Sequence, residues 1–262
     1  MKFLELMKKK GIVAAHRGAR SIAPENTLLS LQKSIGRCDF VEIDAQLSKD
    51  GAVVVMHDDT LQRTTDVTEI EVFKNRAPYR VCDFTDDELL MLDYGSWFKQ
   101  NSGHKEPLLT LRIALEFIKE NSMFINIEIK DMSNSFADKI VVRAVAKEIE
   151  DAGVHERVLL SSFRHEYLRE AKKILFNVPT AALFEGSVQD NLLEYLKDLE
   201  VEACHFDDAS ADEKKVKMLR EAGYAVGVYT VNSAKRAKEL FAMGVNYIFS
   251  DSLDKELKKY AL

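Results

Sequence analysis

Cysteine is scarce in this sequence, with three residues among 262. The three are odd in number, lie far apart and lack the C-x-x-C spacing of zinc and redox sites, which argues against a disulfide framework and against a thiolate metal centre. We expect them to be small core residues of a protein in a reducing compartment, and we therefore predict a cytoplasmic location. They are Cys38, Cys82 and Cys204.

Long apolar runs are also missing. No stretch of about eighteen uncharged apolar residues occurs, so the sequence predicts no transmembrane segment. The opening MKFLELMKKKG has a short apolar stretch, interrupted by Glu5 and followed by charge where a signal peptide needs a cleavage site, so we expect no secretion signal. This stretch predicts a short helix covering apolar core, with a membrane-surface anchor as the alternative. Its apolar residues are Phe3, Leu4, Leu6 and Met7.

A basic stripe is the third absence. The 37 Lys and Arg are intermixed with 43 Asp and Glu, which leaves a net charge of -6 and no patch able to displace the counterions of a nucleic acid. We therefore expect no nucleic-acid partner. A small-molecule substrate fits this composition better.

Short β-rich runs alternate with charged segments of helical apolar spacing. Alternation of strand and helix requires parallel pairing, and eight strand-then-helix units predict a closed TIM (β/α)8 barrel better than a doubly wound sheet. Gly223 and Gly244 fall where helices should end. The expected strands are GIVAAH, DFVEIDAQ, MFINIEIK, VLLSS, TAALFE, EACHFD, YAVGVYT and NYIFSD. The expected helices are Glu25–Ile35, Leu111–Asn121, Phe136–Ala152, Asn191–Leu199, Lys214–Ala222 and Ala234–Met243.

The segment VEIDAQLSKDGAVVVMHD breaks this alternation, because only three residues separate its two β-runs. So short a connection cannot cross between parallel strands and predicts an antiparallel hairpin after the second strand. A two-residue turn at Asp50 and Gly51 would place His57 opposite Asp44. Glu42 would then lie one diagonal away on the same face.

Residues from about 58 to 107 have weak periodicity and follow the hairpin as a long excursion. A connection of this length inside a barrel predicts a lid or small subdomain. We expect one domain over residues 1–262 that carries this insertion. The aromatic residues of the insertion are either packing residues or part of the pocket; they include Tyr94, Trp97 and Phe98.

Polar residues end almost every predicted strand, and in a barrel these ends share one rim, where barrel enzymes have their active sites. Three carboxylates are embedded in the apolar runs FVEID and INIEI, where an unpaired charge is costly and calls for a counter-charge. Three carboxylates without a thiolate form a hard oxygen site, which predicts one divalent cation, Mg²⁺ or Ca²⁺. They are Glu42, Asp44 and Glu128.

Two cations and two histidines reach the same rim. Arg17 and Lys130 either neutralise the carboxylates as structural salt bridges or, with a bound ion, form an anion site suited to phosphate. His16 and His57 arrive from different strands beside charged groups, which predicts a general acid and base pair. At three outer positions we expect solvated or supporting residues: Glu185, Asp207 and Ser250.

The motifs HRG-x5-PENT, VEIDAQLSKDG, VVVMHDDTLQRTT, NIEIK and YTVN together resemble the glycerophosphodiester phosphodiesterase family, over residues 13 to 251. The resemblance implies a barrel enzyme that hydrolyses glycerophosphodiesters, such as glycerophosphocholine or glycerophosphoethanolamine, to an alcohol and sn-glycerol 3-phosphate with a divalent cation. It implies that the insertion shapes the glycerol side of the pocket. It further implies His16 and His57 as acid and base, Glu42, Asp44 and Glu128 as metal ligands, and Arg17 and Lys130 as phosphate contacts.

Some positions depart from the family's pattern, and they bear on substrate preference more than on activity. These are Arg112, Ile113, Tyr229 and Asn246. A lysophospholipase D or phospholipase C-like lipid phosphodiesterase is the alternative enzyme, but it needs an apolar slot or a membrane-binding surface. A non-catalytic phosphoester-binding barrel is the second alternative, which the loss of either histidine would favour; both are present. The nucleophile, water or the substrate's 2-hydroxyl, stays open, as does the oligomeric state.

Overall fold

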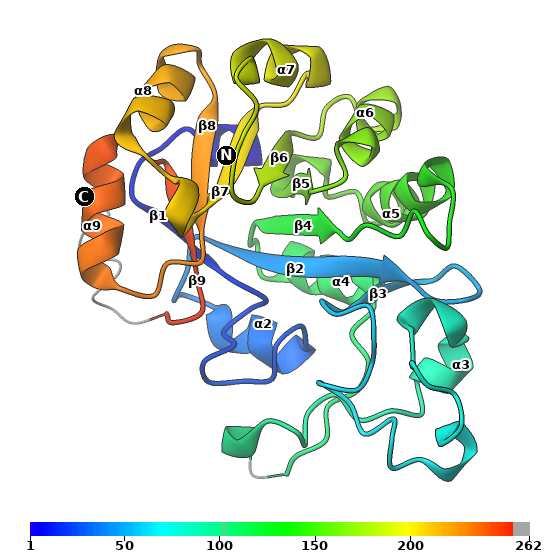
Figure 1. The fold of residues 1–262 in the computed structure, drawn as a ribbon. Coiled ribbons are helices and arrows are strands. Elements are labelled where there is room, and N and C mark those ends of the chain that lie inside the picture. Colours follow the sequence, from blue (N-terminus) through cyan, green and yellow to red (C-terminus); the bar gives the residue numbers. More distant parts are fainter. Residues whose placement is uncertain (102, 254–262) are drawn as a thin grey trace.

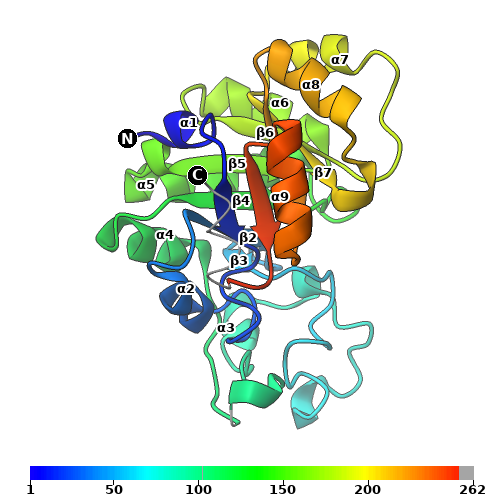
Figure 2. The same cartoon turned by 90° about the vertical axis from the view of Figure 1, so that its left-hand side faces the viewer.

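The computed structural model describes residues 1–101 and 103–253. Eight parallel strands form a closed barrel in the order β1-β9-β8-β7-β6-β5-β4-β2, and β1 also pairs with β2. Figure 2 shows the closure, with β9 beside β1. The strands are β1 (Ile12–Ala15), β2 (Phe40–Leu47), β4 (Ile125–Ile129), β5 (Val158–Ser162), β6 (Thr180–Phe184), β7 (Ala203–Asp207), β8 (Ala225–Tyr229) and β9 (Tyr247–Ser250). The predicted TIM barrel is confirmed, and its strands are almost wholly buried because helices cover their outer faces.

Helices surround the barrel (Figure 1). They are α2 (Leu28–Ser34), α4 (Leu111–Glu120), α5 (Asp138–Ala152), α6 (His165–Ile174), α7 (Leu192–Leu199), α8 (Glu213–Glu221) and α9 (Ala234–Met243). All but α6, which the sequence did not locate, match the expected helices to within a few residues. Gly223 and Gly244 follow α8 and α9 with φ of 92° and 105°, left-handed conformations that glycine adopts without strain. The eighth unit's helix would fall on residues 254–262, which lie outside the described residues.

The hairpin forms as predicted, but in a different register. β3 (Val53–Val55) pairs antiparallel with β2, and Ala45 lies opposite Val55. The amide of Met56 donates to the carbonyl of Asp44 at 3.0 Å, so Asp44 faces Met56 and not His57. The predicted register was wrong by one residue because the connection is a three-residue loop ending in Gly51, with φ of 92°, and not a two-residue turn.

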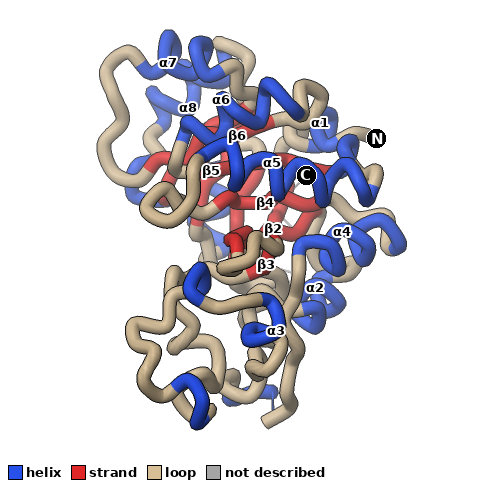
Figure 3. Tube along the Cα trace, turned by 90° about the vertical axis from the view of Figure 1, so that its right-hand side faces the viewer, coloured by secondary structure: helices blue, strands red, loops and turns tan. Residues whose placement is uncertain are grey.

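The insertion between β3 and α4 contains little regular structure. Its elements are η1 (Glu71–Phe73), η2 (Val81–Asp83), α3 (Asp86–Leu89) and η3 (Lys99–Asn101). Buried side chains such as Leu61, Phe73 and Phe84 give it an apolar cluster separate from those of the barrel. Figure 3 shows it as a lobe of loops beside β3, as the expected subdomain requires.

A short helix, α1 (Phe3–Leu6), closes the amino end of the barrel. Phe3 and Met7 are fully buried, and the Phe3 ring meets those of Phe40 and Phe124 edge-on at 5.1 and 5.8 Å. The expected helix over apolar core is therefore confirmed. Within the described residues, no helix has the length and apolar character needed to cross a membrane.

None of the three cysteines forms a disulfide, and only one is a buried core residue. Cys204 is buried on β7, as predicted, whereas Cys38 and Cys82 are half-buried. The core prediction was wrong for these two, because Cys38 lies in the loop before β2 and Cys82 lies in the short helix η2 of the insertion, both outside the strands of the barrel.

Candidate active site

Three carboxylates converge at the carboxyl end of the barrel. Glu42 and Asp44 are two residues apart on β2 and so share the interior face, and Asp44 pairs in parallel register with Glu128 on β4. One oxygen from each lies within 4.8 Å of the others. Glu42 and Asp44 are only 3% and 1% exposed. The fold therefore brings together the three residues that the sequence predicted as ligands.

The three carboxylates lie close enough for the charge of each to affect the others. Burial and the charge of Asp44 raise the pKa of both Glu42 and Glu128. Burial also acts to raise the pKa of Asp44, but Lys130, His57 and Arg17 outweigh it and bring that pKa to about 2. Asp44 is thus the best-neutralised member, whereas the raised pKa values of the other two show charges that are too little compensated, which a bound cation would relieve.

Lys130 and Arg17 reach this cluster from two different loops. The ammonium of Lys130 lies 2.7 Å from Glu128 and 3.5 Å from Asp44. The backbone amide of Arg17, a residue with a left-handed φ of 54°, donates to Glu42 at 2.7 Å. Nε of Arg17 lies 3.5 Å from Oδ2 of Asp44, which is an ion-pair distance, but it makes no hydrogen bond among the described residues. A buried donor without a hydrogen bond at this position suits a ligand oxygen.

Each of the two predicted histidines is held by an aspartate. Nδ1 of His16 lies 2.7 Å from Asp251, which follows β9, and Nδ1 of His57 lies 2.7 Å from Asp58. A carboxylate accepts a hydrogen bond from Nδ1–H and leaves Nε2 available for chemistry. Although the hairpin register differs from the prediction, the positive charge of His57 still lowers the pKa of Asp44, so the ring lies near the cluster.

The sequence interpretation missed the residues that hold this arrangement in place. Arg63 donates to Asp58, and together with His57 it lowers the pKa of that carboxyl despite burial. Glu25 is 3% exposed at its side chain and receives guanidinium groups from Arg17, Arg20 and Arg63. Glu25 lies in the PENT segment and Asp58 follows His57 in the HD dipeptide, so these two motifs already contained the supporting residues.

Ser250 and Asn232 continue this support. The hydroxyl of Ser250 donates to Asn232, whose amide group donates to Asp251 at 2.9 Å. Burial would raise the pKa of Asp251, but hydrogen bonds from His16 and Asn232 outweigh it and hold the pKa below its ordinary value. Ser250 is therefore a buried supporting residue, as expected for this position.

Two other sets of predicted residues lie outside this cluster. Asp207 accepts the amide of Gly186 at 2.9 Å, and Glu185 is exposed. In the insertion, Tyr94 is buried, donates to the carbonyl of Leu89 and accepts the indole N–H of Trp97 at its own carbonyl. Tyr94 is thus a packing residue of the insertion.

A small cavity of about 30 Å³ lies in the barrel interior beside the carboxylates. Oδ1 of Asn126 and Nδ1 of His205 line it, and neither atom has a hydrogen-bond partner among the described residues. The opposite nitrogen of His205 lies 2.7 Å from the hydroxyl of Tyr247. Gly227 makes room for that pair, because a Cβ there would lie 2.3 Å from the Tyr247 ring.

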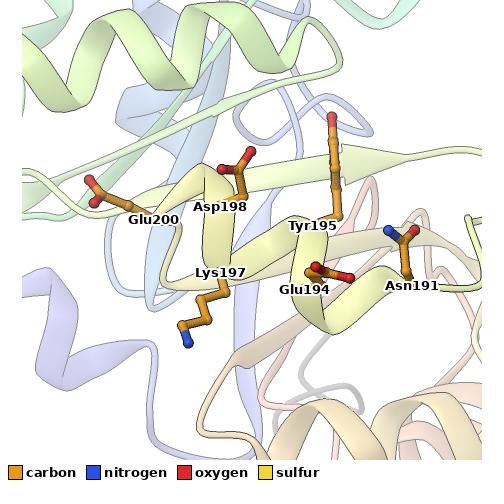
Figure 4. A pocket seen from close by; sticks show the side chains of 6 residues that line it. All are labelled: Asn191, Glu194, Tyr195, Lys197, Asp198 and Glu200. Atoms are coloured by element: carbon orange, nitrogen blue, oxygen red, sulfur yellow. The ribbon is translucent and has the colours of Figure 1, made fainter.

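A larger surface hollow lies elsewhere, over α7, with a volume of about 580 Å³. Figure 4 shows that the side chains lining it point in different directions around the helix, with Lys197 directed away from Tyr195 and Asp198. Groups that do not converge cannot hold one small ligand, so the strand ends are the better candidate site.

A closed eight-stranded barrel with this acidic cluster and two aspartate-held histidines at its carboxyl end defines a (β/α)8-barrel enzyme. The model of the Glycerophosphoryl diester phosphodiesterase family matches residues 16–255. The chain belongs to this family and is a hydrolase.

The comparisons with individual proteins agree. A glycerophosphodiester phosphodiesterase of Bacillus altitudinis is 30% identical over 250 residues, covering 94% of this chain and 96% of the relative. One from Bacillus subtilis (strain 168) is 30% identical over 260 residues, covering 93% and 84%. The structure of an Oleispira antarctica phosphodiesterase, in complex with the product sn-glycerol-3-phosphate, has a TM-score of 0.84 and 30% identity, covering 95% of this chain and 96% of that one.

Proposed function

We propose that the protein hydrolyses glycerophosphodiesters, such as glycerophosphocholine or glycerophosphoethanolamine, to an alcohol and sn-glycerol 3-phosphate, with one divalent cation, Mg²⁺ or Ca²⁺. The observation that carries this proposal is the convergence of three buried carboxylates beside two aspartate-held histidines. The proposed unit is one domain over residues 1–262 with its insertion at about 58–107. The proposed location is the cytoplasm, where cysteines that form no disulfide, as is the case for these three, stay reduced.

The residues present suit a divalent cation. Glu42, Asp44 and Glu128 offer hard oxygen ligands, and Arg17 also pairs with Glu25, so the cluster keeps an excess of negative charge. Glu42 is the least compensated, since its contact with Arg17 is to the backbone amide. When bound, the cation would offset charge on the phosphoryl oxygens.

Arg17 and Lys130 are the proposed phosphate contacts. Both lie against the carboxylates at the strand ends, and Nε of Arg17, which is near Asp44 but makes no hydrogen bond among the described residues, offers a donor to a phosphate oxygen. Donors fixed before the substrate arrives stabilise developing negative charge without reorganising. The salt bridges of these two residues therefore support a binding role besides their structural one.

His16 and His57 are the proposed acid–base pair. Asp251 and Asp58 occupy their Nδ1 atoms, so each Nε2 can exchange a proton with the substrate. One histidine takes the proton of the nucleophile as the oxygen of that nucleophile bonds to phosphorus. The other protonates the leaving alkoxide as the phosphorus–oxygen ester bond breaks. The nucleophile is water or the 2-hydroxyl of the glycerol; the 2-hydroxyl gives a cyclic phosphate, which water then hydrolyses to sn-glycerol 3-phosphate.

The test measures the release of sn-glycerol 3-phosphate from glycerophosphocholine and glycerophosphoethanolamine, and the release of choline from lysophosphatidylcholine, each with and without EDTA. We expect release from the first two substrates that EDTA abolishes and Mg²⁺ or Ca²⁺ restores. Activity that persists after chelation would remove the metal from the proposal, and exclusive turnover of the lysolipid would favour a lipid phosphodiesterase.

The matched variants are His16→Ala and His57→Ala, each expected to lose activity about 10²- to 10⁴-fold while the circular dichroism spectrum is kept. His155→Ala is the control, since His155 precedes β5 at the opposite end of the barrel. Folded histidine variants with full activity would refute the acid–base assignment.

A further inference from the structure

The mouth of the barrel has two chemically different sides. On the side of β1, β2 and β4, four cations surround the carboxylates and histidines: Arg17, Arg20, Arg63 and Lys130. On the side of β5 to β8, the strands end in aromatic and acidic residues. Those residues are Phe163, Glu185, Asp207 and Tyr229, which we call the aromatic–acidic ledge. Binding and cleavage of the phosphate take place on the first side and give the residues of this second side no role.

Two rings form the floor of the ledge. Phe163 comes directly after β5 and Tyr229 ends β8; their rings are 6.1 Å apart and perpendicular. Phe163 is 41% exposed, although a large apolar side chain at a strand end gains by burial. The hydroxyl of Tyr229 donates to the carbonyl of Phe184 at 2.8 Å, which fixes the ring. The pair therefore consists of an exposed Phe163 ring and a half-buried Tyr229 ring that its hydrogen bond holds in place.

The ledge is continuous with the catalytic cluster. Tyr229 lines the same small cavity as His16, Glu42 and Glu128. A substrate whose phosphate lies at the carboxylates can therefore extend one of its two ester arms over the rings. The other arm is then left to the side of the insertion.

The acidic members give the ledge a negative charge. Burial is the main cause of the raised pKa of Tyr229, and the charges of Asp207 and Glu185 add to it, so both carboxylates lie within electrostatic reach of the ring. Within residues 1–101 and 103–253, neither forms an ion pair; Lys215 and Arg236 pair with Asp212 and Asp208 instead. Arg164, next to Phe163, is held by Asp138 on α5.

An aromatic surface among unpaired carboxylates is complementary to an organic cation. Ring faces attract ammonium groups, and quaternary ammonium groups most of all when carboxylates are near, whereas a neutral polyol gains little from either. We propose that the aromatic–acidic ledge binds the cationic alcohol of the substrate, so that the enzyme selects glycerophosphodiesters of ammonium alcohols such as choline. This inference rests on the proposed function and assigns its substrate class.

The test compares kcat/KM for glycerophosphocholine with that for glycerophosphoglycerol, whose alcohol is neutral. We expect the wild-type enzyme to favour the choline ester about tenfold, and Phe163→Leu and Glu185→Gln each to reduce that ratio severalfold. Phe176→Leu is the matched control, because Phe176 is exposed on the loop before β6, at the other end of the barrel. A ratio that Phe163→Leu and Glu185→Gln leave unchanged would overturn the assignment.

Binding of choline itself separates this inference from the proposed function. Line broadening of the choline methyl signal in proton NMR reports binding without turnover. Broadening that Phe163→Leu reduces, in a protein that hydrolyses none of the diesters, would support the ledge and refute the proposed reaction. Hydrolysis of the diesters without a preference for the choline ester and without choline binding would support the proposed reaction and refute the ledge.

Discussion

At the amino end of the barrel, α1 and the first residues of the strands bury apolar rings against one another, whereas the carboxyl end holds three carboxylates within 4.8 Å. Phe3, Phe40 and Phe124 meet edge-on, in contacts that stabilise the fold wherever they occur. Glu42 and Glu128 are buried at a cost, as their raised pKa values record. One end stabilises the molecule, and the other is maintained for ligand binding at the expense of stability.

The largest expected effect separates the two ends by activity. Glu42→Gln should reduce kcat/KM at least about 10³-fold, because it removes a proposed metal ligand and the charge stabilisation that depends on it. The same change should leave the metal-free protein equally or more stable, since the amide keeps an acceptor for Arg17 and lacks the buried charge. Urea unfolding in EDTA measures the second quantity, and clear destabilisation would contradict this account.

The converse change is Phe3→Ala at the closed end. We expect it to lower the free energy of unfolding by about 3–4 kcal/mol, because it leaves a cavity among the rings of α1 and the strand starts. The kcat of the folded fraction should stay near wild type. Leu4→Ala is the control, as Leu4 on the same helix is 37% exposed. A large loss of kcat with little loss of stability would mean that the two ends are coupled.

A smaller effect is expected from the residues that orient the histidines. Asp251→Asn should lower kcat/KM about 10²-fold, because an amide no longer fixes the Nδ1–H tautomer of His16. Asp58→Asn should act likewise on His57. Two-dimensional ¹H–¹⁵N spectra of the rings report the tautomer directly. Unchanged tautomers together with lowered activity would point to an electrostatic role for these aspartates.

The smallest effect concerns pH and the barrel interior. Burial lowers the pKa of His205 to about 3, so the folded state binds its proton less readily than the unfolded chain, whose histidine titrates near 6.5. The stability contributed by neutral His205 is therefore present above pH 6.5 and is lost as pH falls toward 3. At pH 5 the loss should be about 2 kcal/mol. His205→Gln should flatten the stability curve by this amount between pH 7 and pH 5, and parallel curves would contradict the assignment.

Much of the barrel could be predicted from the sequence because its signals are local. Alternation of β-rich runs with helical segments located all eight strands, and Asp44 and Glu128 were expected at one rim because parallel strands share their carboxyl end. The hairpin register was missed, since it depends on whether the loop has two or three residues, which KDG does not decide.

Other features depend on contacts between distant residues. Asp251 contacts His16, which is 235 positions away in the sequence. Glu25 forms ion pairs with Arg17, which precedes it, and with Arg63, which follows it. None of these contacts leaves a periodic trace in the sequence. The insertion likewise has a core of its own without regular alternation, so its existence could be predicted but its path could not.

The position of β1 between β2 and β9 has a consequence for biosynthesis. As the nascent chain emerges, β1 can pair with β2 early, but its other edge must wait for Tyr247–Ser250. His57 and Asp58 are neighbours from the outset, whereas His16 gains its aspartate only when the last strand arrives. The second histidine–aspartate pair therefore forms in the same step that closes the barrel.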